Sequence, residues 1–166
     1  MSTPIATAFL AGLALLVFLD RRPWSATQHE KLRRVPNPPG WFFAVVWTVL
    51  YSAIFFSLWY WHTYHLRHSS MKYFIVGFAG ANLLLNYAWV NVFGYYLATP
   101  NASALPSFVV ICACLETAFI VCVLFGNEES WLPLVCWSVY SLWLVCASVI
   151  NSKYLCLRNT YAPLRS

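Results

Sequence analysis

Hydrophobic residues are gathered into five long segments, which are separated by stretches rich in charged residues, proline or glycine. The segments cover residues 5–19, 41–61, 73–97, 105–125 and 131–157. None shows the regular alternation of polar and apolar positions that is typical of barrel strands, so helices satisfy their backbone groups best within a bilayer. A helix over 41–61 would be about 31 Å long, which matches the hydrocarbon thickness. The pattern predicts an all-α membrane protein, a five-transmembrane-helix bundle forming one domain over residues 1–166.

The composition excludes a water-soluble domain. Apolar residues make up 61% of the chain and charged residues 9%, against about 45–50% and 25% in soluble domains. Most of the ten Lys and Arg residues lie in loop 20–40 or near the C-terminus, on the same side of a five-helix bundle. The positive-inside rule therefore predicts that loop 20–40 and the C-terminus are cytosolic. The net charge of +5 favours anionic lipid headgroups, and no nucleic-acid-binding motif accompanies it.

Motifs for hydrolysis, phosphate transfer or metal binding are absent from the sequence, so no catalytic residue and no metal ligand is predicted. The six Cys include no C-x-x-C pair. His62, His65 and His68 are spaced three apart, but no carboxylate or Cys completes a metal shell there. Glu116 lies in the middle of segment 105–125, where a carboxyl group is costly to bury. It is either a functional group or a protonated side chain that is hydrogen-bonded to a neighbouring helix.

Aromatic residues form 19% of the chain, more than a lipid-facing helix needs. Several of them share a helix face with polar or small residues, because they are spaced three or four apart. These stripes are Trp47 and Tyr51; Asn82, Asn86 and Trp89; and Tyr140, Trp143, Ala147 and Asn151. Asn residues that join helices and an interfacial aromatic belt are one interpretation. The three Trp residues lie one to three turns inside their segments, which favours a cleft for a large, flat, mostly apolar ligand.

Longer motifs surround these stripes. They are Pro36-Asn37-Pro38-Pro39-Gly40-Trp41 followed by Trp47-Thr48-Val49-Leu50-Tyr51, then Asn82-x-x-x-Asn86-x-x-Trp89-x-x-x-Phe93, then Tyr140-x-x-Trp143 with Asn151. This set resembles the N-P-P-x-W…W-T-x-L-Y, Q-x-x-x-N-x-x-W-x-P-x-F and P-Y-x-x-W…L-N motifs of the translocator protein family (TspO/MBR). The family's members are also called tryptophan-rich sensory proteins or peripheral benzodiazepine receptors. Pro36, Asn91 and Val139 depart from the family pattern, and the last two replace prolines that kink helices.

The resemblance implies a five-helix bundle, often a homodimer, with a ligand cavity beneath the first loop. The implied ligands are tetrapyrroles, sterols and benzodiazepine-like drugs; no cofactor is required, and protoporphyrin IX or haem is a candidate ligand. The implied ligand-binding residues are Trp47, Tyr51, Asn86, Trp89, Tyr140, Trp143 and Ala147. Val149, Tyr154 and Arg158 match the family's sterol motif, although an interfacial Tyr and a snorkelling Arg explain them equally well.

The expected function is that of a membrane translocator or receptor that binds these ligands. The resemblance implies the outer mitochondrial membrane in a eukaryote, or the cell envelope in a bacterium. Two alternatives remain open. One is a porphyrin-degrading enzyme that uses indole radicals, and the other is a scaffold for membrane proteins. Only the small-x-x-x-small pairs Ala8/Gly12 and Gly77/Ala81 support the scaffold from the sequence.

Overall fold

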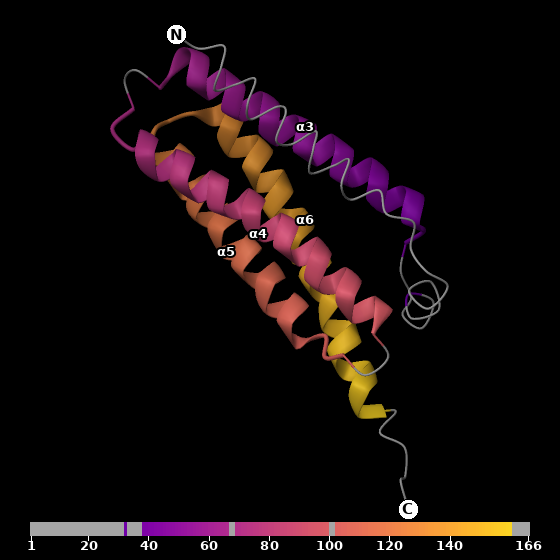
Figure 1. Ribbon diagram of the computed structural model, residues 1–166. Coiled ribbons are helices and arrows are strands. Elements are labelled where there is room, and N and C mark those ends of the chain that lie inside the picture. Colours follow the sequence, from indigo (N-terminus) through magenta and orange to yellow (C-terminus); the bar gives the residue numbers. More distant parts are fainter. Residues whose placement is uncertain (1–31, 33–37, 67–68, 100–101, 161–166) are drawn as a thin grey trace, which may run out of the picture.

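A computed structural model describes residues 32, 38–66, 69–99 and 102–160, with side chains as far as residue 155. Within these ranges, helices α3 (Gly40–Tyr64), α4 (Lys72–Ala98), α5 (Leu105–Asn127) and α6 (Trp131–Thr160) form an elongated bundle (Figure 1). They cover the last four predicted segments, and each continues slightly past its predicted end. Segment 5–19 and nearly all of loop 20–37 lie outside the described residues. The structure therefore shows four of the five predicted helices.

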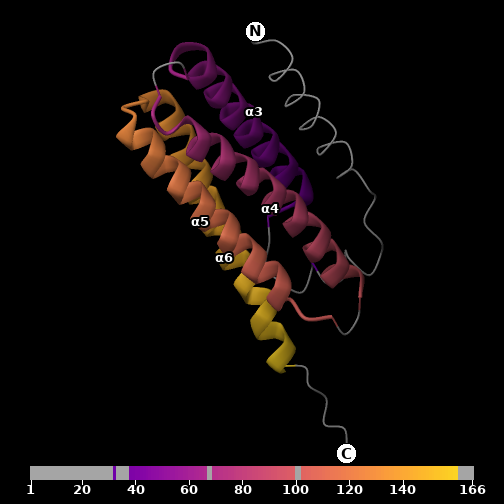
Figure 2. The same ribbon diagram turned by 60° about the vertical axis from the view of Figure 1, so that its left-hand side comes forward.

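The order of the helices in space differs from their order in the chain. Helix α4 packs against α5, α5 against α6, and α6 against α3. Figures 1 and 2 show α4 and α5 side by side along their length. Short connections explain the first two pairings, because a helix joined by a tight turn folds back on its predecessor. The pairing of α3 with α6 joins distant parts of the chain and brings their aromatic stripes together.

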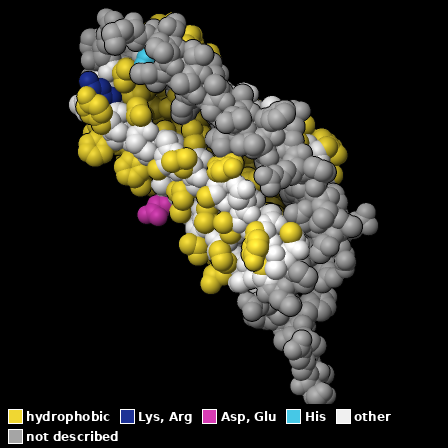
Figure 3. All heavy atoms as spheres, viewed as in Figure 1, with side chains coloured by type: hydrophobic (Ala, Val, Ile, Leu, Met, Phe, Trp, Pro, Cys, Tyr) yellow, Lys and Arg dark blue, Asp and Glu magenta, His cyan; other side chains and the backbone are white. Residues whose placement is uncertain are grey.

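The outer surface of the bundle is hydrophobic. In the most apolar 18-residue stretch of each helix, only 17% to 33% of the residues are buried. Most of the apolar side chains in these stretches therefore point outward. Val49, Leu84, Phe119 and Leu142 are each more than 60% exposed, one on each of the four helices. Figure 3 shows hydrophobic side chains over much of one described face. Because apolar surface on this scale is unstable in water, this is a multi-pass membrane protein.

The turn between α5 and α6 also holds the start of α4. The Glu128 carboxylate accepts hydrogen bonds from the backbone N–H of Met71, at 3.1 Å, and from the hydroxyl of Ser70, at 3.4 Å. A negative charge at this position interacts favourably with the positive end of the α4 dipole. The next residue, Glu129, has a φ of 52°, which is the left-handed conformation that closes many helix ends. One short turn therefore fixes the ends of three helices.

Candidate functional site

Trp47 lies at the centre of a cluster of aromatic rings from three helices. Its indole stacks on Tyr51, one turn later on α3, with ring centroids 5.3 Å apart. The rings of Trp89 from α4 and Trp143 from α6 are each 6.1 Å away, and the ring of Tyr140 from α6 is 6.4 Å away. These separations are typical of favourable aromatic pairs. The three predicted stripes thus meet at one place.

Further aromatic rings extend this cluster at both ends. Phe42 and Phe43, at the start of α3, lie 6.2 and 5.8 Å from Trp143. At the other end, Phe93 stacks on Trp89 at 5.4 Å, and Tyr154 packs edge-on against Phe93 at 5.5 Å. Phe42, Phe43 and Phe93 were not among the residues expected at the site from the sequence. Phe43 and Phe93 lie one turn from Trp47 and Trp89, and this spacing is the signal that could have identified them.

A chain of hydrogen bonds runs beneath the rings and joins four helices. The Tyr51 hydroxyl donates to Asn86 Oδ1 at 3.1 Å, and Asn86 Nδ2 donates to the Tyr140 hydroxyl. The Tyr140 hydroxyl donates in turn to Asn82 Oδ1 at 2.8 Å. Asn82 Nδ2 then donates to the Cys114 carbonyl at 2.7 Å and to Thr117 Oγ1 at 2.9 Å. Each side-chain amide has both a donor and an acceptor contact, as a stable buried polar network requires.

This network changes the interpretation of the polar residues in the stripes. Asn82, Asn86 and Tyr140 are fully or almost fully buried. Both amides bond to the Tyr140 hydroxyl, while Asn86 also bonds to α3 and Asn82 to α5. In a bilayer such bonds hold helices together. The part of Asn82 in anchoring α4 to α5 depends on Cys114 and Thr117, which the sequence pattern did not identify.

The three predicted tryptophans differ from these buried groups because they are partly exposed. Trp47, Trp89 and Trp143 are of intermediate exposure. The indole N–H groups of Trp89 and Trp143 are inaccessible to water and have no hydrogen-bond partner within the described part of the chain. An unpaired buried donor is unusual, and it becomes available to an acceptor on a bound molecule when the side chains that cover it move aside. Within the described ranges the indole N–H groups of Trp61 and Trp137 also lack a partner, but these side chains are almost completely buried.

The remaining predicted residues fall in several environments. Ala147 is buried one turn after Trp143, whereas Asn151 accepts a hydrogen bond from Ser107 at 2.9 Å and joins α6 to α5. Val149 is 53% exposed on the lipid-facing side of α6, while Tyr154 is 1% exposed among the rings. The structure therefore places these two members of the sterol motif on different sides of α6. The side chain of Arg158, the third member, lies outside the described residues.

Glu116 is exposed on the outer side of α5. Among the residues that the structure describes, no hydrogen-bond or ion-pair partner of its carboxyl group is found. The alternative in which Glu116 bonds to a neighbouring helix is therefore not realised within the described part of this chain. No group of three or more His, Cys, Asp or Glu side chains in that same part could hold a metal ion.

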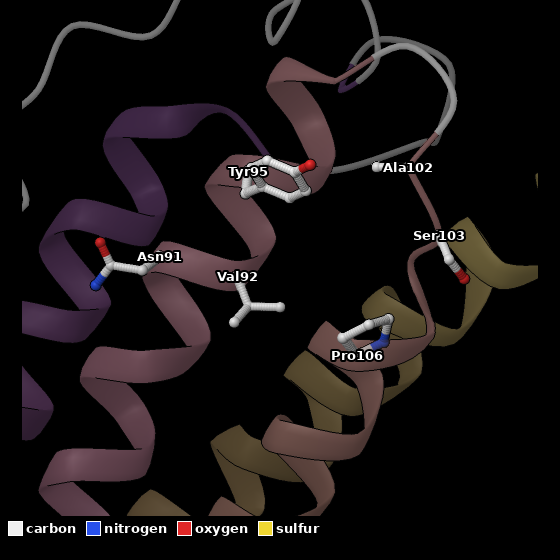
Figure 4. A pocket seen from close by; sticks show the side chains of 6 residues that line it. All are labelled: Asn91, Val92, Tyr95, Ala102, Ser103 and Pro106. Atoms are coloured by element: carbon white, nitrogen blue, oxygen red, sulfur yellow. The ribbon is translucent and has the colours of Figure 1, made fainter.

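A separate groove lies on the outer surface near the connection between α4 and α5 (Figure 4). Its volume is about 490 Å³, and most of its lining is apolar. It is lined by Asn91, Val92, Tyr95, Ala102, Ser103 and Pro106. None of the predicted ligand-binding residues belongs to it, so it is distinct from the cluster around Trp47.

Comparison with known proteins agrees with the motifs at the centre of this cluster. The sequence profile of the TspO/MBR family matches residues 5–157, a range that includes all five predicted hydrophobic segments. No curated protein and no solved structure was found to match the chain. The aromatic stripes, their meeting point and the length of the matched region agree: the chain belongs to the TspO/MBR family.

Proposed function

We propose that this protein binds flat, largely apolar ligands of the tetrapyrrole class at the aromatic cluster around Trp47, as a membrane receptor or translocator. Protoporphyrin IX and haem are the candidate ligands. The observation that carries the proposal is the convergence of three partly exposed indoles, Trp47, Trp89 and Trp143, from three different helices. Ligand sites of this kind are apolar and aromatic, with a few polar groups that orient the ligand.

The rings supply the apolar contact area that a flat macrocycle needs. Trp47 is tilted by 39° to Trp89 and is nearly perpendicular to Trp143, at 88°. Indoles in these orientations offer both faces and edges to a π-system, and each such contact contributes about 0.5–1.5 kcal/mol beyond the burial of apolar area. A tetrapyrrole is large enough to contact several of these rings at once.

The unpaired indole N–H groups supply the orienting contacts. Trp89 and Trp143 each have a buried donor without an acceptor in the described part of the chain. Tetrapyrroles such as protoporphyrin IX carry carboxylate groups, and hydrogen bonds to a carboxylate are about twice as strong as those to a neutral acceptor. Binding a ligand carboxylate would satisfy a donor that is otherwise left unpaired at a cost in stability.

The hydrogen-bonded network keeps the site ready for the ligand. Tyr51 and Tyr140 belong both to the ring cluster and to the chain of bonds through Asn86 and Asn82. Because these bonds fix the rings before the ligand arrives, less conformational entropy is lost on binding. Asn86 and Tyr140 thus contribute to the site mainly as positioning residues.

Several finer features belong to the same proposal. Sterols and benzodiazepine-like drugs are further ligands of the cluster, and residues 5–19 form the fifth membrane helix. The concentration of cationic residues supports a cytosolic C-terminus. The family supports the outer mitochondrial membrane in a eukaryote and the cell envelope in a bacterium.

Titration of protoporphyrin IX into the detergent-solubilised protein tests the proposal. Binding is followed by quenching of Trp fluorescence and by the shift of the porphyrin absorption band. We expect the double variant Trp47→Phe/Trp143→Phe to bind about tenfold more weakly, because two indole contacts are reduced. An unchanged affinity would overturn the assignment of the site.

A matched control tests whether the loss of affinity is specific to the cluster. The variant Trp59→Phe/Trp131→Phe changes two tryptophans on the outer surface, which are 44% and 73% exposed, and should bind as the wild type does.

Two further measurements separate this proposal from its alternatives. The first is porphyrin breakdown under light, at a porphyrin concentration that saturates the Trp47→Phe/Trp143→Phe variant. Breakdown by the wild type that is lost in this variant would instead indicate the degrading enzyme. A purified protein that binds no tetrapyrrole or sterol, but co-purifies with one partner, would indicate the scaffold.

A further inference from the structure

The groove between the end of α4 and the start of α5 lies outside the aromatic cluster. Val92 and Tyr95 line it from α4, Pro106 lines it from α5, and Ala102 and Ser103 belong to the connection between the two helices (Figure 4). Its volume of about 490 Å³ lies within the range of roughly 300–1,000 Å³ that is typical of ligand sites. Because it opens on the outer surface of a membrane protein, a molecule that fills it comes from the bilayer.

The position of the groove along α4 places it at the edge of the hydrocarbon layer. Helix α4 has 27 residues, so it is about 40 Å long and exceeds the hydrocarbon thickness by roughly 10 Å. Tyr95 is three residues from the end of α4 at Ala98, near the boundary where membrane proteins concentrate Tyr. Val92 lies about one turn deeper. The groove therefore runs from the headgroup region to the level where acyl chains begin.

The polar groups of the groove are hydrogen-bond donors. Ser103 Oγ accepts the Leu105 N–H at 3.2 Å, so its hydroxyl hydrogen can donate to another molecule. Tyr95 is 67% exposed, and its hydroxyl can donate as well. The amide of Asn91 is already bonded to the Tyr87 carbonyl on its own helix, at 2.8 Å. The ester and phosphate oxygens of a phospholipid are acceptors, so they complement the two hydroxyls.

The groove lies at the cationic end of the bundle. Most of the ten Lys and Arg residues precede α3 or lie near the C-terminus, and antiparallel helices bring both to the end where α4 stops and α5 starts. Ser107, which follows Pro106, donates to Asn151 of α6 at 2.9 Å, and the exposed Lys153 is two residues further on. Cations at a membrane surface attract anionic headgroups.

We propose that this groove binds one membrane phospholipid with an anionic headgroup. An acyl chain lies against Val92 and Pro106, while the hydroxyls of Tyr95 and Ser103 donate to the oxygens where the chains join the headgroup. The headgroup faces the cationic end of the bundle. The lipid contacts both α4 and α5 and is separate from the aromatic cluster, with which the groove shares no predicted ligand-binding residue.

Native mass spectrometry of the detergent-solubilised protein tests the preference for an anionic lipid. Bound lipid is counted during titration with palmitoyl-oleoyl phosphatidylglycerol, or with phosphatidylcholine that carries the same chains. We expect phosphatidylglycerol to bind about fivefold more tightly or better, because each basic residue near a membrane surface contributes about that factor. Equal affinities for the two lipids would overturn the proposal.

Variants that fill the groove test its place in the fold. Val92→Trp puts an indole where the acyl chain lies and should weaken phosphatidylglycerol binding by about tenfold or more. Ala102→Leu narrows the groove from the connection and should act in the same direction. Val76→Trp is the matched control, since Val76 is 58% exposed near the other end of α4. Wild-type affinity in both groove variants, with helix content unchanged by circular dichroism, would contradict the proposal.

Two substitutions of Ser103 separate the contact with the lipid from the local structure. Asn and Asp both keep an oxygen that can accept the Leu105 N–H. Ser103→Asn also keeps a donor and should bind phosphatidylglycerol within about twofold of the wild type. Ser103→Asp removes the donor and adds a negative charge, so it should bind about tenfold more weakly. Equal affinities of these two variants would exclude the contact.

Competition distinguishes the phospholipid from other occupants. Soluble glycerol 3-phosphate should not displace phosphatidylglycerol, because it has no acyl chain to lie in the groove. Displacement by it would show that the headgroup alone is bound and would contradict the proposed placement. Cholesterol that displaces the phospholipid from the wild type at an equal concentration would assign the groove to a sterol and overturn the proposal.

Discussion

The Tyr140 hydroxyl donates a 2.8 Å hydrogen bond to Asn82 Oδ1, and so connects α6 to the inner face of α4. The same hydroxyl accepts a hydrogen bond from Asn86, one turn further along α4. One phenol group therefore satisfies two amides on a single helix face. The ring that carries it also packs against Trp47, at 6.4 Å. This residue couples the structural network to the aromatic site.

Removal of this hydroxyl should destabilise the bundle. In Tyr140→Phe the ring remains, but Asn82 Oδ1 and Asn86 Nδ2 lose their partner in a buried environment. We expect a loss of about 1–2 kcal/mol in the free energy of unfolding, measured by denaturation in mixed micelles. Tyr95→Phe, which removes a hydroxyl from a residue that is 67% exposed, should have no comparable effect. Equal stability of Tyr140→Phe and wild type would contradict the role of the network.

The contact between Asn82 and Thr117 should contribute to the packing of α4 on α5. Asn82 Nδ2 donates to Thr117 Oγ1 at 2.9 Å, and both residues have a second bond. A double-mutant cycle with Asn82→Ala and Thr117→Val should give a coupling free energy of about 0.6 kcal/mol, the average for such bonds in a membrane protein. A coupling of zero would show that the two side chains act independently.

Glu128 should stabilise the start of α4. Its carboxylate accepts the Met71 N–H and the Ser70 hydroxyl, so Glu128→Ala leaves a helix N-terminus without its cap. The expected loss is about 0.5–1 kcal/mol, because the position is partly open to solvent. Thermal unfolding followed by circular dichroism measures it. Glu129→Gln, which alters the exposed neighbour, is the matched control and should be neutral.

A glycine at position 129 should stabilise the protein. Glu129 has a φ of 52°, which a residue with a side chain adopts at a cost and glycine adopts freely. We expect Glu129→Gly to raise the unfolding free energy by about 0.5–1 kcal/mol. The same change at Ser130, whose φ is not positive, should bring no such gain. A lower stability of Glu129→Gly would show that the left-handed conformation is not a source of strain.

The indole N–H of Trp89 should recognise a ligand carboxylate. Trp89→Phe keeps an aromatic ring stacked near Phe93 but removes the unpaired donor. Affinity for protoporphyrin IX should fall about tenfold or more, since a hydrogen bond to a charged group contributes about 1.5–3 kcal/mol. Affinity for its dimethyl ester should change less, because the ester is a weaker acceptor. Titrations of both ligands, with Trp59→Phe as control, make the comparison, and equal losses would rule out this contact.

Much of this architecture could be predicted from residue patterns. The long apolar segments predicted α3 to α6 nearly to their ends, because the bilayer demands helices of sufficient length and this demand acts on each segment alone. Trp47, Trp89 and Trp143 were predicted to line one site, and the ring of Trp47 lies 6.1 Å from each of the other two. Residues that are unremarkable along the chain were missed. Thr117 and the Cys114 carbonyl acquire their role only by lying opposite Asn82.

Hydrophobic length and motif spacing are local properties of the chain, so they were sufficient to predict the membrane environment, the helical segments and the family. How the polar residues divide between roles depends instead on the packing of the helices. The pairing of α3 with α6, and of α4 with α5, directs Asn82, Asn86 and Tyr140 into bonds with one another. It also directs Glu116 away from the bundle. The spacing of residues along a helix determines which of them share a face. Whether that face points into the bundle or toward lipid depends on the neighbouring helices against which the helix packs.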